Sequence, residues 1–381
     1  HPQLLRGHGG HPLFLDPQAR QIIYSNLHNI SRLRGNLCMP NSNIRLIIER
    51  NIPYVAGLLD DCATVRYLAP EEITPKAVRD TDGIMIRTRT RCNAELLAKS
   101  DVKLIATATI GTDHIDLDYC RDHSITVVNA PGCNAPAVAQ YVFATLLNVI
   151  NRPLQSYTLG IVGVGHVGSI VERWAKALDM KVLRCDPPRQ QAEGGDNWVD
   201  LDTIAREADI ITFHTPLTRD GEHPTYHIAN EAFFNSLRRA PIIINSARGE
   251  IVDTPALIAA RDTGKVGAMI IDCWEHEPDI DRELLCRANI ATPHIAGYSQ
   301  EGKIRASQVA LDALTTFFMT PRVTVDQPMP PAPAQSVNIR GILSTYDPMP
   351  EVKKLKEHPE DFEKIRNTYP LRHEAPEGTT H

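Results

Sequence analysis

The sequence lacks every cysteine spacing that is typical of a structural zinc site or a disulfide scaffold. Its eight cysteines are scattered along 381 residues, at positions 38, 62, 92, 120, 133, 185, 273 and 286. No two of them form a CxxC pair. Isolated thiols of this kind are usual in a reducing compartment, so we expect a cytoplasmic protein.

Long hydrophobic runs are also missing. The longest apolar stretch, roughly residues 138–150, falls short of the ~20 residues that a membrane helix needs. The start of the sequence shows no basic segment followed by an apolar one, as a secretory signal would. We therefore expect no membrane association.

Neither sign of charge dominates the sequence. Forty Lys and Arg residues stand against 46 Asp and Glu residues, for a formal net charge of -6, and no long block of one sign occurs. This distribution argues against the basic surface by which proteins bind nucleic acids. A small molecule is the expected partner.

The length predicts two domains, because single hydrophobic cores seldom grow past about 250 to 300 residues. Residues 1–43 show no sustained periodicity, and we expect an N-terminal extension there. Short apolar runs then alternate with helix-compatible segments, at 44–48, 63–68, 83–86, 103–109 and 125–128. This alternation predicts a parallel, doubly wound domain of the flavodoxin-like kind over residues 44–140, completed by 300–321.

A second series of six apolar runs predicts a Rossmann domain over residues 141–299. The runs lie at 158–165, 181–185, 209–213, 241–245, 268–272 and 289–292. A long helix, residues 134–150, precedes them, with Asn134 as its N-cap and Pro136 in its first turn. Residues 322–381 contain a proline-rich linker and a weakly patterned C-terminal segment, which we expect to be a tail or small accessory element.

The segment GIVGVGHVG (160–168) spans the end of the first of these six runs, and its glycines lie between the predicted strand and the start of a helix. It contains Gly163, Gly165 and Gly168 in GxGxxG spacing, with His166 and Val167 between them, and Asp186 follows the next run. Glycines let the backbone approach a pyrophosphate at a helix N-terminus, and an acid in this place binds the adenosine ribose. The motif predicts an NAD site; the alternatives are a glycine turn that only packs strand on helix, and NADP bound with the help of Arg189.

Three further residues follow later strands of the same domain: Arg248, Glu277 and His294. The carboxyl ends of parallel strands form the ligand edge of such a sheet. Arginine suits a substrate carboxylate, histidine suits proton transfer, and a glutamate can orient that histidine. The set suits oxidation of a 2-hydroxy acid, although each residue alone could equally be a loop cap, an exposed turn acid or a core histidine.

The neighbouring Glu275 and His276 raise the alternative of a metal cluster with Glu277 and His294. Successive loop residues do not supply converging ligand directions, so we expect no metal. Glu275 and His276 are then expected to be solvated spacers.

The chain resembles the D-isomer-specific 2-hydroxyacid dehydrogenase family over roughly residues 44–320. The resemblance is carried by ATATIGTDHID (106–116), NAPGCNAPAVAQYVF (129–143), GIVGVGHVG, TFHTPL (212–217), CWEHEPD (273–279) and TPHIAGYSQEGK (292–303). It implies a substrate-binding lid domain over 44–140 and catalytic roles for Arg248, Glu277 and His294. At NAD it places the glycine motif with Asp186, Thr215, Ser246, Ala247, Arg248, Asp272 and Gly297, and at the substrate Thr88, Thr109 and Tyr298.

The combination of PGCNA, DPPR and HIAGY resembles a branch of this family that serves vitamin B6 biosynthesis and acts on a phosphorylated 2-hydroxy acid. The phosphate requires positive charge, and RTRTR (87–91) is expected to place Arg87, Arg89 and Arg91 on one side of an extended segment. Arg87 adjoins Thr88 and is the candidate phosphate ligand. The alternative is that this Arg/Thr alternation only keeps the end of an edge strand soluble.

The resemblance also implies a homodimer, because residues 347–374 are weakly similar to the dimerisation region of that branch. Two other functions stay open at this point. One is oxidation of another D-2-hydroxy acid such as 3-phosphoglycerate, and the other is a non-catalytic, NAD-sensing scaffold of the same fold.

Overall fold

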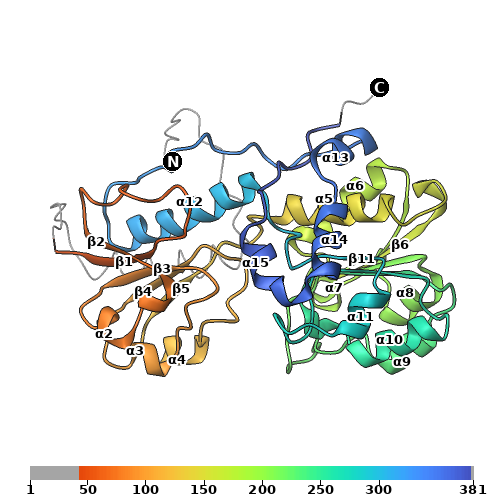
Figure 1. Ribbon diagram of the computed structural model, residues 1–381, viewed down its shortest axis with the longest axis horizontal. Helices are drawn as coiled ribbons and strands as arrows, with labels where there is room; N and C mark the ends of the chain where they lie inside the picture. The colour runs from red at the N-terminus through yellow and green to blue at the C-terminus, as the bar shows by residue number, and fades with distance from the viewer. Residues whose placement is uncertain (1–42, 379–381) are drawn as a thin grey trace, which may run out of the picture. The chain divides into compact units, whose positions relative to one another are not determined.

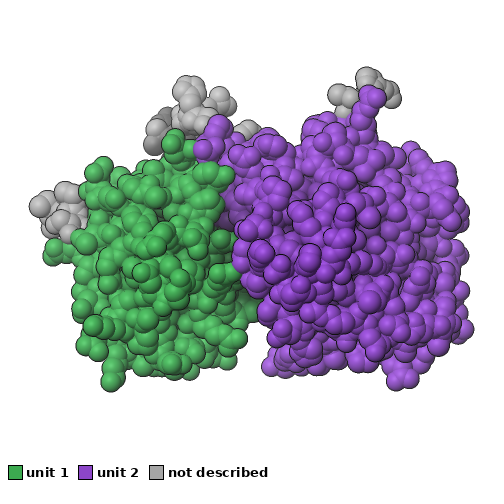
Figure 2. Space-filling view, viewed as in Figure 1, with its two compact units in different colours: residues 1–131, 308–326 green, residues 132–307, 327–381 purple. Residues whose placement is uncertain are grey.

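A computed structural model of the chain describes residues 43–378. The N-terminal extension expected over residues 1–43 thus lies, but for its last residue, outside the described residues. The chain divides into two compact units (Figure 2): unit 1 holds residues 1–131 and 308–326, and unit 2 holds residues 132–307 and 327–381. In the described part of the chain, no helix has the length and hydropathy that crossing a membrane requires.

Unit 1 contains a parallel sheet of five strands in the order β2-β1-β3-β4-β5 (Figure 1). The strands are β1 (Arg45–Glu49), β2 (Thr64–Leu68), β3 (Gly83–Ile86), β4 (Leu104–Thr107) and β5 (Thr126–Val128). Every residue of β3 and β4 is buried, as continuous apolar runs in a covered parallel sheet require. The helices between them are short: α2 (Pro75–Val78), α3 (Ala94–Leu97) and α4 (Leu117–Asp122). All five predicted strands are confirmed.

Unit 2 contains a parallel sheet of six strands in the order β11-β10-β9-β8-β6-β7. The strands are β6 (Thr158–Val162), β7 (Lys181–Cys185), β8 (Ile210–Phe213), β9 (Ile242–Asn245), β10 (Ala268–Ile271) and β11 (Ile290–Ala291). The connecting helices include α7 (Pro187–Glu193), α8 (Leu201–Glu207), α9 (Glu231–Ser236), α10 (Thr254–Asp262) and α11 (Arg282–Arg287). The predicted count of six strands is confirmed.

The order of this sheet differs in one place from the usual Rossmann order, in which the third strand lies outside the second. Here the third strand in sequence, β8, lies directly beside β6. At the place outside β7 that a third strand usually takes, the Val199 N–H donates a backbone hydrogen bond to the Arg184 carbonyl at 2.8 Å. The reversal of strand order still falls at β6, whose carboxyl end is therefore the expected ligand crevice.

Two helices with strong apolar patterns pack in the core of unit 2, α5 (Ala135–Leu147) and α6 (His166–Ala177). Asn134 takes the predicted N-cap position of α5, but its side chain makes no capping hydrogen bond. On α6 the predicted face is confirmed, since Ile170, Val171 and Trp174 are buried.

From residue 327 on, the C-terminal segment is part of unit 2, as an accessory element rather than a tail. It forms α13 (Ile339–Thr345), α14 (Met349–Glu357) and α15 (Phe362–Asn367), after the longer α12 (Gln300–Phe317). Leu355 and Phe362 are fully buried in a core cluster of unit 2. Helices of six to nine residues bury only one to three side chains each, which is too few for a periodic pattern to show in the sequence.

Candidate active site

The residues expected at the cofactor and at the chemistry all lie beyond the carboxyl ends of strands in unit 2. The turn from β6 to α6 holds Gly163 to Gly168, and the exposed His166 and half-buried Val167 begin α6. The other positions are Asp186 after β7, Thr215 after β8, Ser246, Ala247 and Arg248 after β9, Asp272 and Glu277 after β10, and His294, Gly297 and Tyr298 after β11. The parallel sheet thus brings together residues that are up to 135 positions apart, from Gly163 to Tyr298.

Each glycine of the β6–α6 turn meets a different steric demand. Gly163 has φ +89, and a Cβ there would lie 2.7 Å from the Thr215 nitrogen. A Cβ on Gly168 would lie 2.1 Å from the Gly163 oxygen, so only glycine allows α6 to pack this closely on the turn. A Cβ on Gly165 would meet nothing within 4 Å, so there is open space at the N-terminus of α6, the end of a helix that suits an anionic group.

Asp186 and Arg189 both support this turn. The Asp186 carboxylate accepts hydrogen bonds from the Val164 N–H at 2.8 Å and from the Arg189 N–H at 3.0 Å. The Arg189 guanidinium donates to the Val164 carbonyl, to Ser169 Oγ at 2.9 Å and to Glu193 Oε1 at 2.6 Å. Because its donors are engaged within the protein, Arg189 is poorly placed to favour the extra phosphate of NADP.

Two hydroxyls expected at the cofactor are buried and have no hydrogen-bond partner among residues 43–378. They are Thr215 Oγ1 and Ser246 Oγ, from the turns after β8 and β9. A buried hydroxyl without a partner costs about 1 to 3 kcal/mol, so such groups usually serve a ligand. Together with the open space at Gly165, they fit a polar cofactor along this edge of the sheet.

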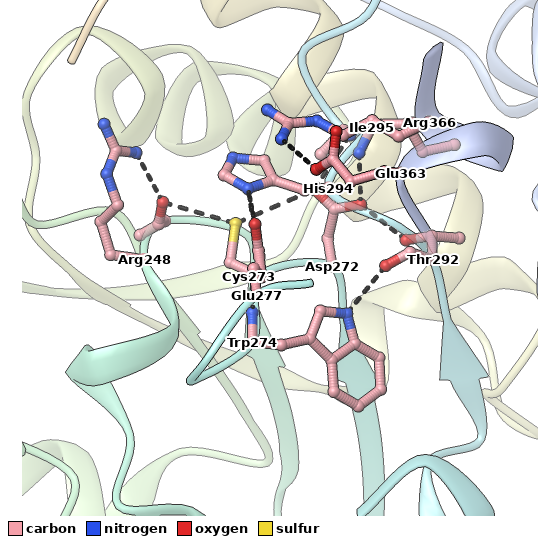
Figure 3. Close-up of polar contacts among 12 residues, drawn as sticks. Arg248, Asp272, Cys273, Trp274, Glu277, Thr292, His294, Ile295, Glu363 and Arg366 are labelled. Carbon is pink, nitrogen blue, oxygen red and sulfur yellow. Dashed lines mark hydrogen bonds and ion pairs between the residues drawn. The ribbon is translucent and has the colours of Figure 1, made fainter. Parts of the chain in front are cut away.

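Glu277 and His294 form a hydrogen-bonded pair (Figure 3). Nδ1 of His294 lies 2.8 Å from Glu277 Oε2 and 3.1 Å from Oε1, and the Trp274 N–H donates to Oε1 at 2.9 Å. Burial alone would raise the pKa of Glu277, but His294, the Trp274 N–H and Arg366 together lower it. The carboxylate therefore stays ionised and can orient the ring and stabilise an imidazolium.

The loop that carries His294 is anchored on Asp272, which is fully buried. One oxygen of Asp272 accepts from Thr292 Oγ1 at 2.7 Å and from the Ile295 N–H at 2.8 Å, and the other accepts from the Ala296 N–H at 3.0 Å. Burial raises the pKa of Asp272, although these hydrogen bonds act to lower it. His294 itself has φ +56, a left-handed conformation that the surrounding bonds hold in place.

Arg248 lies in the turn between β9 and the single turn η3 (Gly249–Ile251). Its Nη1 donates to the Ala247 carbonyl at 2.8 Å. The turn is held by Asn245, whose side chain donates to the Arg248 carbonyl at 2.9 Å and accepts from the Ala247 N–H at 3.2 Å. Sequence reasoning missed Asn245, although an amide at the buried end of a strand is a signal that could have identified it.

Cys273, Glu277 and His294 place three metal-binding atoms within 4.8 Å of one another. Burial raises the pKa of the Cys273 thiol well above its usual value, with Asp272 and Glu277 adding to the effect. A neutral thiol is a poor ligand, and Nδ1 of His294 is already bound to Glu277. The geometry therefore favours a proton-handling pair over a metal centre.

The expectation that Glu275 is a solvated spacer is wrong. Its side chain is 10% exposed and accepts hydrogen bonds from the Thr254 N–H at 3.0 Å, with His227 Nε2 2.7 Å away. Burial acts to raise the pKa of Glu275, but these contacts outweigh it and the pKa is lowered. Glu275 thus ties the loop after β10 to the start of α10, whereas His276 is exposed, as expected.

In unit 1, Thr88 and Thr109 leave neighbouring strands at the same edge of the sheet. Ile86 pairs with Thr107, and each threonine follows two residues after its member of that pair. The Thr109 hydroxyl donates to the Gly111 carbonyl at 2.9 Å, while the Thr88 side chain is exposed.

The predicted extended form of RTRTR is wrong. β3 ends at Ile86 and the chain turns at Thr88 and Arg89, because Thr90 and Cys92 return to the core and are buried. The alternation of an extended strand therefore does not hold across this segment. Arg87 is half-buried, with its N–H donating to Glu49 Oε2 at 2.9 Å and its Nη1 to the Asn51 carbonyl at 3.4 Å.

Comparison with known proteins places this site in context. Residues 140–296 match the family model described as D-isomer specific 2-hydroxyacid dehydrogenase, NAD binding domain. The predicted NAD cofactor is thereby confirmed.

Similar sequences include erythronate-4-phosphate dehydrogenase of Bacteroides thetaiotaomicron, 45% identical over 338 residues, which are 87% of this chain and 97% of that protein. The enzyme of the same name from Cronobacter sakazakii is 37% identical over 87% of this chain and 92% of its own length. These names confirm the narrower resemblance inferred from PGCNA, DPPR and HIAGY.

Among solved structures, D-lactate dehydrogenase from Aquifex aeolicus, complexed with NAD and lactic acid, has a TM-score of 0.63 and 27% identity. The match covers 72% of this chain and 96% of that one. Its fold confirms the predicted pair of α/β domains with parallel sheets.

Proposed function

The chain belongs to the D-isomer-specific 2-hydroxyacid dehydrogenase family, and from that membership we propose that it oxidises 4-phospho-D-erythronate with NAD to 2-oxo-3-hydroxy-4-phosphobutanoate. This reaction would serve the biosynthesis of pyridoxal 5'-phosphate. The observation that carries the proposal is the Glu277–His294 hydrogen bond at 2.8 Å, on the ligand edge of an NAD-binding domain. The relatives named erythronate-4-phosphate dehydrogenase, which match 87% of this chain, support the choice of substrate.

Three side chains divide the chemistry in this proposal. NAD, when bound, accepts the hydride that leaves C2 of the substrate. His294 takes the hydroxyl proton at Nε2, since Nδ1 is held by Glu277. Glu277 stabilises the resulting imidazolium, and Arg248 binds the substrate carboxylate through its planar guanidinium.

We further propose that NAD is bound by the glycine turn and by the side chains that surround it in unit 2. Asp186 would bind the adenosine ribose, while Thr215 and Ser246 would use their unpartnered hydroxyls. The remaining expected positions are His166, Val167, Ala247, Asp272 and Gly297. Of these, Asp272 acts through the loop that it anchors.

Substrate recognition is proposed to involve the domain expected over residues 44–140, with Arg87 at the phosphate and Thr88 and Thr109 close by. Tyr298 is the remaining residue that we propose for the substrate. Support for Arg87 comes from its position at the carboxyl end of β3, beside the buried Glu49, which fixes the Arg87 backbone. Burial raises the pKa of Glu49, opposed by Arg87 and Arg89.

The test is steady-state NADH production with NAD and, in parallel, 4-phospho-D-erythronate, D-erythronate without its phosphate, and 3-phosphoglycerate. We expect 4-phospho-D-erythronate to give the highest kcat/KM. Arg87→Ala should raise KM for the phosphorylated acid by about tenfold or more and leave the unphosphorylated acid unaffected. Arg91→Ala, an exposed arginine of the same segment, is the matched control.

If 3-phosphoglycerate gives a higher kcat/KM than 4-phospho-D-erythronate, the proposed substrate is wrong. An absence of NAD reduction with every 2-hydroxy acid would instead indicate a non-catalytic NAD-binding protein.

We also infer a cytoplasmic homodimer that associates through the C-terminal segment. Ile339 and Leu343, one helical turn apart on α13, are 42% and 45% exposed, and Met349 is 43% exposed. Apolar side chains exposed on one helix face are typical of an interface. Light scattering should give twice the chain mass, and Leu343→Glu should give the monomer; a wild-type monomer would contradict the inference.

A further inference from the structure

The last described stretch of the chain is fastened to the loop that carries His294. The backbone of Arg372 pairs with Ser299 in an isolated parallel bridge, and its carbonyl accepts from the Gln300 N–H at 2.9 Å. The buried Arg372 guanidinium donates to the Ile295 carbonyl at 3.1 Å, to the Tyr298 carbonyl at 3.0 Å and to the Ala296 carbonyl. The loop from Ile295 to Tyr298 is therefore held by the C-terminal segment.

A second arginine of the segment, Arg366 on α15, reaches a side chain of the same loop. Its Nε donates to the Tyr298 hydroxyl at 3.1 Å, and its Nη1 lies 3.5 Å from Glu363 Oε1. The Arg366 side chain is 17% exposed, and Glu363 is 41% exposed. An ion pair with so exposed an acid is worth little, so the Glu363 contact alone does not account for a largely buried guanidinium.

Figure 3 draws Arg366 in the same close-up as Glu277 and His294, and the positive charge of Arg366 acts on Glu277. Burial opposes the charged form of Arg366, but the fields of Tyr298, Glu277 and Glu363 raise its pKa. In turn, Arg366 is one of the groups that lower the pKa of Glu277. The guanidinium and the Glu277 carboxylate thus stabilise each other without a direct ion pair.

We propose that Arg366 is a positioning residue of the active site, which holds the Tyr298 hydroxyl and fixes a positive charge beside the Glu277–His294 pair. This inference rests on the proposed function and adds to it a group from outside the family's NAD-binding domain, residues 140–296. A fixed positive charge disfavours an extra proton on the pair. Arg366 is therefore one of the groups that make the pair harder to protonate as the pH falls.

Other charged and titratable groups surround the pair and Arg366. Asp272, from the loop after β10, interacts with His294, and Cys273 of the same loop interacts with Glu277, Arg366 and Arg248. Tyr298, from the loop after β11, and Glu363, from α15, act on Arg366 itself. Because Arg366→Gln removes one positive charge from this set, the pair should retain its proton to higher pH.

The experiment compares Arg366→Gln, Arg366→Lys and Tyr298→Phe with wild type in oxidation of 4-phospho-D-erythronate. For Arg366→Gln we expect the acid limb of the kcat/KM profile to move up by about half a pH unit or more. Arg366→Lys and Tyr298→Phe keep the charge, so their acid limb should coincide with that of wild type while KM rises. Arg340→Gln, an exposed arginine on α13, is the control and should match wild type throughout.

An NMR titration of the His294 ring in the full-length apo chain reads the same effect without turnover. A displacement of its midpoint in Arg366→Gln, absent in Arg366→Lys, supports the proposal. Unchanged midpoints in both variants would overturn it. Equal losses of activity in Arg366→Gln and Arg366→Lys, with no movement of the acid limb, would also overturn it, because they would indicate a purely structural role. If wild type shows no turnover but Arg366→Gln still displaces the His294 midpoint, the proposed substrate is wrong and the role of Arg366 stands.

Discussion

Oε2 of the Glu277 carboxylate lies 2.8 Å from Nδ1 of His294, and the Trp274 N–H donates to the other oxygen, Oε1, at 2.9 Å. A carboxylate that the backbone fixes at one oxygen orients the imidazole that it contacts. Only Nε2 of the ring is then left for a proton exchange with a substrate. The same carboxylate is kept ionised by its neighbours, which is the state that this role requires.

Replacement of His294 by alanine should nearly abolish turnover, because general base catalysis is typically worth about 10²–10⁴-fold. NADH binding should remain within about twofold of wild type, since the cofactor contacts come from other turns. Fluorescence titration with NADH and steady-state kinetics check the two parts. His276→Ala, an exposed residue of the preceding loop, serves as control; retention of wild-type kcat in His294→Ala would remove the assignment.

Two glycines of the β6–α6 turn should respond to alanine in opposite ways. In Gly168→Ala the new methyl group would lie 2.1 Å from the Gly163 oxygen, so we expect at least about 2 kcal/mol lower free energy of unfolding. In Gly165→Ala the methyl group enters open space, and we expect near wild-type stability with about tenfold weaker NAD binding. Thermal unfolding and calorimetric NAD titration separate the outcomes; unchanged NAD affinity in Gly165→Ala would contradict the proposed pyrophosphate position.

The sequence predicted the strands of both sheets and the residues at their carboxyl ends. Buried parallel strands are continuous apolar runs, and the glycine motif meets two steric requirements of the turn, at Gly163 and at Gly168. These signals are local, so they can be read without knowledge of the packing. The convergence of Arg248, Glu277 and His294 then followed from the single rule that parallel strands end at one edge.

What the sequence did not reveal depends on contacts between distant residues. Glu275 is paired with His227, 48 positions away, and nothing near either residue indicates this. Arg372 binds carbonyls of a loop 74 to 77 positions away, through backbone groups that every residue possesses. The turn at Thr88 and Arg89 depends on the burial of Thr90 and Cys92, which overrides the period of two in RTRTR.

His214 should make unit 2 less stable in mild acid. Burial lowers the pKa of His214 to about 3, and its Nε2 lies 2.9 Å from the hydroxyl of the buried Thr212. The unfolded chain binds a proton at pH values below about 6.5, where the folded chain does not. Stability is thus complete above that pH and is lost progressively as the pH falls toward the folded value.

Urea unfolding at several pH values tests this dependence. Between pH 7 and pH 5 we expect His214 to account for about 1 to 2 kcal/mol of the loss in unfolding free energy. His214→Gln keeps a donor near Thr212 but does not titrate, so its stability should fall less over this interval. Parallel pH dependence in wild type and variant would show that His214 is protonated equally in the folded and unfolded states.

The unpartnered hydroxyl of Thr215 should be dispensable for folding and needed for the cofactor. Thr215→Val keeps the shape and removes a buried oxygen that has no hydrogen-bond partner, so the apo protein should be as stable as wild type or up to about 1 kcal/mol more stable. NAD binding should weaken by about three- to tenfold, because one hydrogen bond to the cofactor is lost. Thr212→Val is the matched contrast: its hydroxyl lies 2.9 Å from His214 Nε2, so its loss should destabilise the apo protein. If Thr215→Val destabilises the apo protein like Thr212→Val and leaves NAD affinity unchanged, Thr215 serves the fold and not the cofactor.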